Sequence, residues 1–117
     1  MGHLSTHVLD TVNGRPGAGI AVMLDRLDSD GSRQRLAEAL TNRDGRTDSP
    51  LLSGALVPGT YELTFAIGAY FRSLGTALPQ PAFLDLVPVR FGIAEADGRY
   101  HVPLLASPWS YSTYRGS

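Results

Sequence analysis

Thirteen glycines and eight prolines divide this chain of 117 residues into short segments, and this division constrains the fold more than any other feature. Between these residues, apolar and polar side chains alternate, as they do on a strand with one buried face. Turn-forming residues at strand-like intervals favour β-structure with many turns. The length suits a single domain, so we expect residues 1–117 to form one unit with one modest core.

The alternating pattern predicts about seven strands and one short helix, arranged as an all-β Greek-key β-sandwich. The predicted strands cover residues 5–12, 20–27, 32–41, 61–67, 86–94, 99–106 and 109–114, and residues 51–52 are too short for more than a small edge strand. Residues 32–41 have good helix propensity, but they lie between two turn clusters at strand-like spacing, so we interpret them as a strand. Residues 69–74 are expected to form the helix, which Gly75 would end. Strands 86–94 and 99–106 are expected to pair as a hairpin around Ala96-Asp97-Gly98.

Composition excludes several classes of function. With 10 basic and 11 acidic residues, the chain has no excess of positive charge for binding nucleic acid. It has no cysteine, which excludes disulfides, thiolate zinc sites and thiol nucleophiles. No apolar run approaches a membrane span, and no export signal precedes the first strand, so we expect a cytoplasmic protein with no membrane partner.

His101 is the first candidate for chemistry. In its predicted strand, Tyr100, Val102 and Leu104 share the face that the core should bury, so His101 points outward together with Pro103 and Leu105. An apolar outer surface of this kind indicates burial against another subunit. A histidine at such an interface is a candidate base, although a packed or exposed structural histidine remains the alternative.

His7 and Arg46 are weaker candidates on their own. His7 lies in the middle of the first strand, where a neutral imidazole could accept a proton from water or hold a substrate. Arg46 follows an Asp-Gly turn, where a solvated cation is the ordinary interpretation. His3 is expected in a frayed amino terminus. Because the three histidines lack metal-ligand spacing, we expect no metal and no cofactor.

The last eight residues combine hydroxyls, aromatic rings and a cation in the order Ser-Tyr-Ser-Thr-Tyr-Arg-Gly-Ser. Such a tail indicates a function, or else a polar terminal strand that keeps a sheet edge soluble. The chain contains no Gly-x-Ser-x-Gly elbow, no phosphate-binding loop and no carboxylates paired for glycoside chemistry. The residues by themselves therefore indicate a β-sandwich with a possible histidine and arginine site.

Three segments together resemble a known family. They are Leu4-Ser5-Thr6-His7-Val8-Leu9-Asp10-Thr11 with Gly14-Arg15-Pro16, then Thr41-Asn42-Arg43-Asp44-Gly45-Arg46, and finally Tyr100-His101-Val102-Pro103-Leu104-Leu105 running into the tail from Ser107 to Ser117. Their order and spacing are similar to the signatures of the 5-hydroxyisourate hydrolases, which belong to the transthyretin-like proteins. The resemblance extends from Gly2 to Ser117, and hormone-carrying transthyretins end in an apolar strand instead.

This resemblance implies a transthyretin-like fold of two four-stranded sheets with one short helix. It also implies a homotetramer, built as a dimer of dimers, with active sites in the channel between dimers. His7, Arg46 and His101 would form the catalytic group, and His7, Arg46, Tyr114 and Ser117 would bind the substrate. The implied reaction is the hydrolytic ring opening of 5-hydroxyisourate to 2-oxo-4-hydroxy-4-carboxy-5-ureidoimidazoline in urate (purine) breakdown.

The implied residues suit this reaction, because it needs attack by water on a carbonyl, a holder for the developing anion and a proton for the leaving nitrogen. One of His7 and His101 would deprotonate the water while Arg46 binds the oxyanion or the anionic purine. The guanidinium should lower the pKa of a neighbouring histidine and keep the imidazole neutral. Which histidine is the base stays open.

Two other functions are alternatives to hydrolysis for a chain with this pattern. A transthyretin-like module could carry an apolar hormone without catalysis, but buried imidazole and guanidinium groups would contribute little to such binding. A structural or adhesion β-sandwich would make the motif residues incidental.

Overall fold

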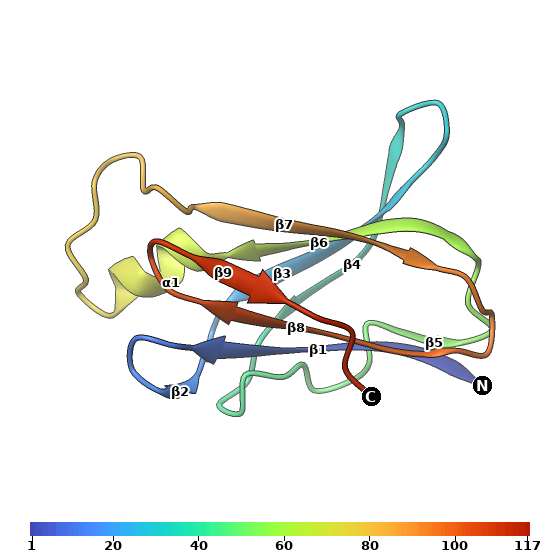
Figure 1. Cartoon of the computed structure of the whole chain (residues 1–117), viewed down its shortest axis with the longest axis horizontal. Helices are drawn as coiled ribbons and strands as arrows, with labels where there is room; N and C mark the ends of the chain where they lie inside the picture. The colour runs from blue at the N-terminus through green and yellow to red at the C-terminus, as the bar shows by residue number, and fades with distance from the viewer.

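The computed structural model describes all 117 residues and consists of two β-sheets packed face to face, with a short helix at one end (Figure 1). The first sheet contains β2 (Arg15–Pro16), β1 (Gly2–Asp10), β8 (Arg99–Ala106) and β9 (Tyr111–Thr113), and β5 (Leu52–Gly54) also pairs with β1. The second sheet contains β4 (Arg33–Leu40), β3 (Ala21–Leu27), β6 (Gly59–Ala66) and β7 (Leu86–Ile93), and α1 spans Ile67–Ser73. The predicted β-sandwich is confirmed, but the first sheet has five strands instead of four. The reason is that β2 and β5 are both short and pair with opposite ends of β1.

The core lies between the sheets and follows the predicted alternation. Tyr61, Leu63 and Phe65 of β6 point inward, and so do Tyr100 and Val102 of β8. Twenty buried hydrophobic residues form one continuous cluster. Because side chains alternate with a period of two, a slip of one residue would turn such a row to solvent. Burial of the inward side chains therefore fixes the register of each strand, and this also fixes which side chains, including His101, point outward.

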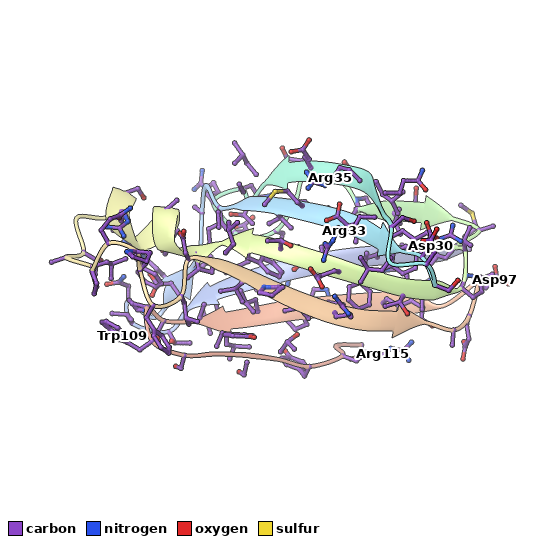
Figure 2. All side chains as sticks on the ribbon, turned by 90° about the horizontal axis from the view of Figure 1, so that it is seen from above. Asp30, Arg33, Arg35, Asp97, Trp109 and Arg115 are labelled. Atoms are coloured by element: carbon purple, nitrogen blue, oxygen red, sulfur yellow. The ribbon has the colours of Figure 1, made fainter.

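The predicted hairpin between residues 86–94 and 99–106 is wrong. β7 pairs with β6 in the second sheet, whereas β8 pairs with β1 in parallel and with β9 in antiparallel orientation in the first. The turn around Asp97 therefore carries the chain from one sheet to the other. The Tyr100 hydroxyl accepts hydrogen bonds from the backbone N–H groups of Ala94 and Glu95, both at 3.0 Å, and anchors this turn. Figure 2 places Asp97 at the end of the molecule opposite Trp109.

Residues 32–41, which have helix propensity, were predicted to form a strand, and β4 confirms this. The backbone of β4 pairs with β3 along its length, and this tertiary pairing outweighs the helix preference of the segment. The helix begins two residues earlier than predicted, at Ile67. Its Tyr70 hydroxyl donates a buried hydrogen bond of 2.7 Å to Asp10, which ties α1 to the end of β1. At seven residues, α1 is much shorter than a helix that could span a bilayer.

The first strand begins at Gly2, three residues before the predicted start. His3 pairs with Ser53 of β5 on one side and with Arg99 of β8 on the other. The expectation that His3 lies in a frayed terminus is therefore wrong. A neighbouring strand on each side supplies backbone partners that the local sequence does not reveal.

Candidate active site

The candidate site lies on the outward face of β1 and β8. The parallel register of these strands sets His3 beside Arg99, Ser5 beside His101, and His7 beside Pro103. A pocket of about 290 Å³ opens on this face, lined by His3, Ser5, Arg46, Arg99, His101 and Ser117. None of these side chains is apolar or acidic, so the pocket is polar and suited to an anion.

A tight turn brings Arg46 to this pocket. The Asn42 side-chain oxygen accepts hydrogen bonds from the backbone N–H groups of Asp44 at 2.9 Å and Arg46 at 3.2 Å. Gly45 has a φ of +76°, and a Cβ there would lie 2.5 Å from the Val8 carbonyl oxygen. Only glycine fits this approach. Because the Gly45 carbonyl also accepts the Val8 N–H at 2.8 Å, the turn is joined to β1, and Arg46 forms a β-bridge with His7.

The carboxyl-terminal tail crosses beside His101. The Gly116 N–H donates to the His101 carbonyl at 2.7 Å, and a Cβ on Gly116 would lie 2.5 Å from the ring carbon Cδ2 of His101. The Arg115 guanidinium lies 4.3 Å from the centre of the Tyr100 ring, which anchors the tail further. These contacts set Ser117 at the pocket.

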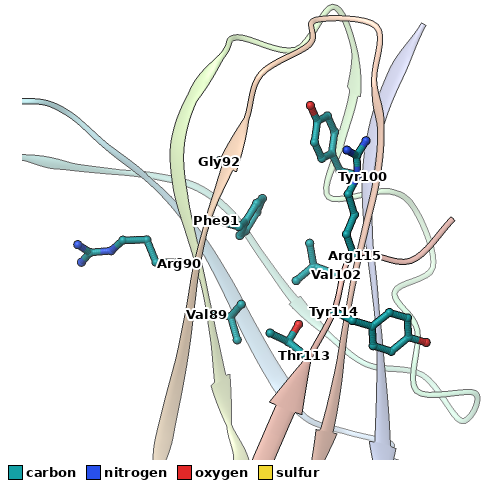
Figure 3. A pocket seen from close by; sticks show the side chains of 9 residues that line it. All are labelled: Val89, Arg90, Phe91, Gly92, Tyr100, Val102, Thr113, Tyr114 and Arg115. Carbon is teal, nitrogen blue, oxygen red and sulfur yellow. The ribbon is translucent and has the colours of Figure 1, made fainter.

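Tyr114 has a different place in the single chain. It is 60% exposed and belongs to a second hollow of about 230 Å³ at the open edge between the sheets, and not to the polar pocket. Val89, Phe91 and Val102 point into this apolar hollow, while the ring of Tyr114 points away from it (Figure 3). The structure therefore brings Arg46, His101 and Ser117 together and sets His7 beside Arg46, but it does not bring Tyr114 to them.

The surroundings of both candidate histidines lower their pKa values and so favour the neutral form. Burial lowers the pKa of His101, and the positive charge of Arg46 lowers it further, with smaller effects from His7 and His3. Burial and then Arg46 also lower the pKa of His7, against a partial opposing effect of Asp44. The predicted influence of the guanidinium is confirmed in direction, although burial is the larger cause. A neutral imidazole can accept a proton at pH 7.

Three pocket residues were missed from the sequence: His3, Ser5 and Arg99. The alternation of β1 already places His3, Ser5 and His7 on one face, so it contained a signal for the first two. Arg99 could not be assigned to the pocket from the sequence, because its position there depends on the pairing of β8 with β1. Across the chain, no three histidine, aspartate or glutamate side chains are arranged to hold a metal ion.

The arrangement suits general acid and base chemistry on a substrate that develops negative charge. Two neutral imidazoles can move protons, and Arg46 forms no ion pair within the chain, so its guanidinium is available to an oxyanion. The model of the HIUase/Transthyretin family matches residues 4–116.

The chain belongs to the HIUase/Transthyretin family. It is 60% identical over 117 residues to "5-hydroxyisourate hydrolase 2" of Rhizobium meliloti (strain 1021), an alignment that covers 99% of this chain and 97% of that relative. The chain is therefore similar over nearly its full length to a protein named as a hydrolase.

Solved structures of similar proteins agree with this fold. A 5-hydroxyisourate hydrolase from Klebsiella pneumoniae aligns over 100% of both chains with a TM-score of 0.82 and 35% identity. Sea bream transthyretin in complex with thyroxine aligns over 97% of this chain and 93% of its own, with a TM-score of 0.85 and 27% identity. An (S)-allantoin synthase matches at a TM-score of 0.93 and 49% identity, but the chain spans only 44% of that longer protein.

Proposed function

We propose that this chain is a 5-hydroxyisourate hydrolase, a single-domain enzyme over residues 1–117 that opens the six-membered ring of its substrate with water. The observation that carries the proposal is the polar pocket, which holds His101 and Arg46 with His7 beside them, in a chain 60% identical to a protein of that name. The product would be 2-oxo-4-hydroxy-4-carboxy-5-ureidoimidazoline.

In the proposed mechanism, one imidazole takes a proton from water as the water oxygen bonds to the ring carbonyl carbon. Arg46 holds the oxygen of that carbonyl as it becomes negative. The carbon–nitrogen bond then breaks, and the leaving nitrogen receives a proton from an imidazolium. The carbonyl carbon becomes the carboxy group, and the released nitrogen becomes part of the ureido group. No step requires a metal or cofactor.

His7 and His101 share the two proton transfers in this scheme, and either order satisfies the chemistry. Both rings are neutral near pH 7 because burial and Arg46 lower their pKa values. The first transfer would protonate one of them, and Arg46 beside it would favour rapid release of that proton to the leaving nitrogen. Acid and base catalysis of this kind contributes about 10²–10⁴ to a rate.

We propose further that the enzyme is a homotetramer, a dimer of dimers with its sites in the channel between dimers. Pro103 is already buried in the single chain, but Leu105 and Leu9 support this assembly, because they are apolar and stay accessible on the outward face that carries the polar pocket. A second copy would cover them, and Tyr114 of the tail would join the substrate site through that assembly. Light scattering during size-exclusion chromatography tests this proposal, and a monomer mass at micromolar concentration would contradict it.

The direct test of the activity is the ultraviolet absorbance decay of freshly generated 5-hydroxyisourate. Fast decay with the wild type and near-background decay with His101→Ala would support both the reaction and the site. Background decay with both proteins, together with tight binding of thyroid hormone, would support a carrier instead. The polar lining of the pocket disfavours that alternative. The cytoplasmic location stays a prediction from the sequence, and cell fractionation would test it.

A further inference from the structure

The His101 ring has one hydrogen-bond partner in the chain, and it is Ser5. The Ser5 Oγ lies 2.8 Å from the Nδ1 of His101. The parallel pairing of β1 and β8 places the two residues side by side on the outward face. Both are half-buried, so the contact is shielded from solvent in part. A hydrogen bond to one imidazole nitrogen determines how the other can act.

Gly116 packs against the His101 ring at Cδ2, away from the Nδ1 atom that contacts Ser5. Its Cα lies so close to the Cδ2 of His101 that an added Cβ would come within 2.5 Å of that carbon. Ser5 therefore contacts the Nδ1 edge while the tail packs against the Cδ2 edge. The Nε2 atom lies at the far end of the ring and makes no hydrogen bond within the chain. It is the nitrogen left to face the polar pocket that His101 lines.

A hydroxyl is suited to this position because it can donate or accept a hydrogen bond. It can thus hold Nδ1 whether or not that nitrogen carries the proton, as a ring that both takes and gives a proton at Nε2 requires. A carboxylate in its place would orient the ring but would also favour the imidazolium. The other groups around the ring are His3 and His7 of β1, Arg99 of β8, Arg46 of the turn and Ser117 of the tail. None of these side chains is acidic.

We propose that Ser5 is a positioning residue, whose hydroxyl holds the His101 ring so that Nε2 faces the substrate. The contact itself is independent of the reaction, and its effect on turnover rests on the proposed hydrolase function. Ser5 acts through His101, so its loss should lower kcat and leave KM nearly unchanged.

The experiment compares Ser5→Ala, Ser5→Thr and Ser5→Asp with the wild type in two measurements. The first is the nitrogen-15 NMR spectrum of the His101 imidazole in the substrate-free protein as pH is varied. The second is steady-state kinetics with 5-hydroxyisourate as substrate, which separates kcat from KM. Ser32→Ala, in the exposed turn before β4, is the matched control and should change neither measurement.

We expect Ser5→Ala to lower kcat by about 5- to 20-fold, as the loss of one positioning hydrogen bond would, and to shift the Nδ1 resonance. Ser5→Thr keeps the hydroxyl and suits a strand, so it should restore both. Ser5→Asp should move the titration of His101 to higher pH, with the acidic limb of kcat/KM following.

Two outcomes separate this inference from the hydrolase proposal. If the wild type degrades 5-hydroxyisourate and Ser5→Ala leaves kcat and the His101 resonances unchanged, Ser5 has no positioning role. If Ser5→Thr behaves like Ser5→Ala, the hydroxyl is not the feature that matters, and the inference is overturned as well. If the wild type shows no hydrolysis but the resonances respond as expected, the contact is supported and the hydrolase proposal fails.

Discussion

The outer faces of the two sheets use arginine in opposite ways. On the second sheet, the buried carboxylates of Asp25 and Glu62 lie side by side, and Arg33 contacts both, at 3.2 and 3.0 Å. Arg35 pairs with Asp25 at 2.6 Å, and Arg90 pairs with Glu62 at 3.0 Å. Figure 2 shows Arg33 and Arg35 on this sheet. On the first sheet, the pocket around Arg46 contains no acidic side chain.

This difference separates a structural cation from a functional one. A guanidinium that is already paired with a carboxylate has few free donors for an anionic ligand. The buried carboxylate in turn depends on this pairing, because an unpaired charge is costly to bury. The Arg46 guanidinium has no such partner, so a developing oxyanion can take that place. The first sheet tolerates its cations because the nearby histidines remain neutral, which limits the repulsion among them.

Removing the unpaired arginine should have the largest effect. We expect Arg46→Ala to lower kcat by about 10²–10³, because the developing negative charge loses its charge-assisted hydrogen bonds. Single-turnover decay of 5-hydroxyisourate measures this loss. Arg35→Ala is the matched control on the other sheet, and its kcat should equal that of the wild type. Equal turnover of Arg46→Ala and Arg35→Ala would remove the distinction between the two faces.

Breaking the ion pairs of the second sheet should affect stability instead of turnover. Glu62→Gln leaves Arg33 and Arg90 without one of their carboxylates, so we expect the free energy of unfolding to fall by about 1–3 kcal/mol. The loss is modest for a buried carboxylate because the side chains of these arginines are 46% and 61% exposed, so solvent screens both ion pairs. Urea denaturation measures the change. A large loss of kcat in the folded variant would show that the second sheet contributes to catalysis.

The two faces should also differ in their effect on the pH profile. Arg46 lowers the pKa of His7 and His101, so Arg46→Gln should raise both values. Activity needs a neutral imidazole and is lost as pH falls through its pKa, so the acidic limb of kcat/KM should move to higher pH. Burial still lowers the pKa of His101, so the limb should stay below the ordinary value of 6.5. An unchanged limb in Arg46→Gln would contradict the electrostatic role.

Arg99 should give the smallest effect. It lines the same pocket, but it is exposed and follows the β7–β8 turn at the start of β8. We expect Arg99→Gln to raise KM by about two- to fivefold, the range of an exposed charge interaction, with kcat unchanged. Added salt should reduce the difference from wild type by screening. A loss of kcat as large as that of Arg46→Ala would place Arg99 at the reacting atoms.

Much of this fold and of the candidate site could be predicted from the sequence. The alternation through Tyr100, Val102 and Leu104 correctly turned His101 outward. The predicted hairpin between β7 and β8 was wrong because a short glycine-containing turn suits a hairpin and a crossing between sheets equally well. Interpreting His3 as frayed was wrong for a related reason, since its order comes from strands distant in sequence.

The sequence by itself determined which side chains face the core and how the turn from Asn42 to Arg46 is built, because side-chain period and glycine conformation are local properties. Only the tertiary structure decided that β8 lies parallel to β1, with Ser5 against His101 and Arg46 bridged to His7. The physical reason is that alternation specifies the face of a strand but not its neighbour. That neighbour is set by the packing of the whole sandwich, and it gives the two sheets their opposite surroundings for arginine.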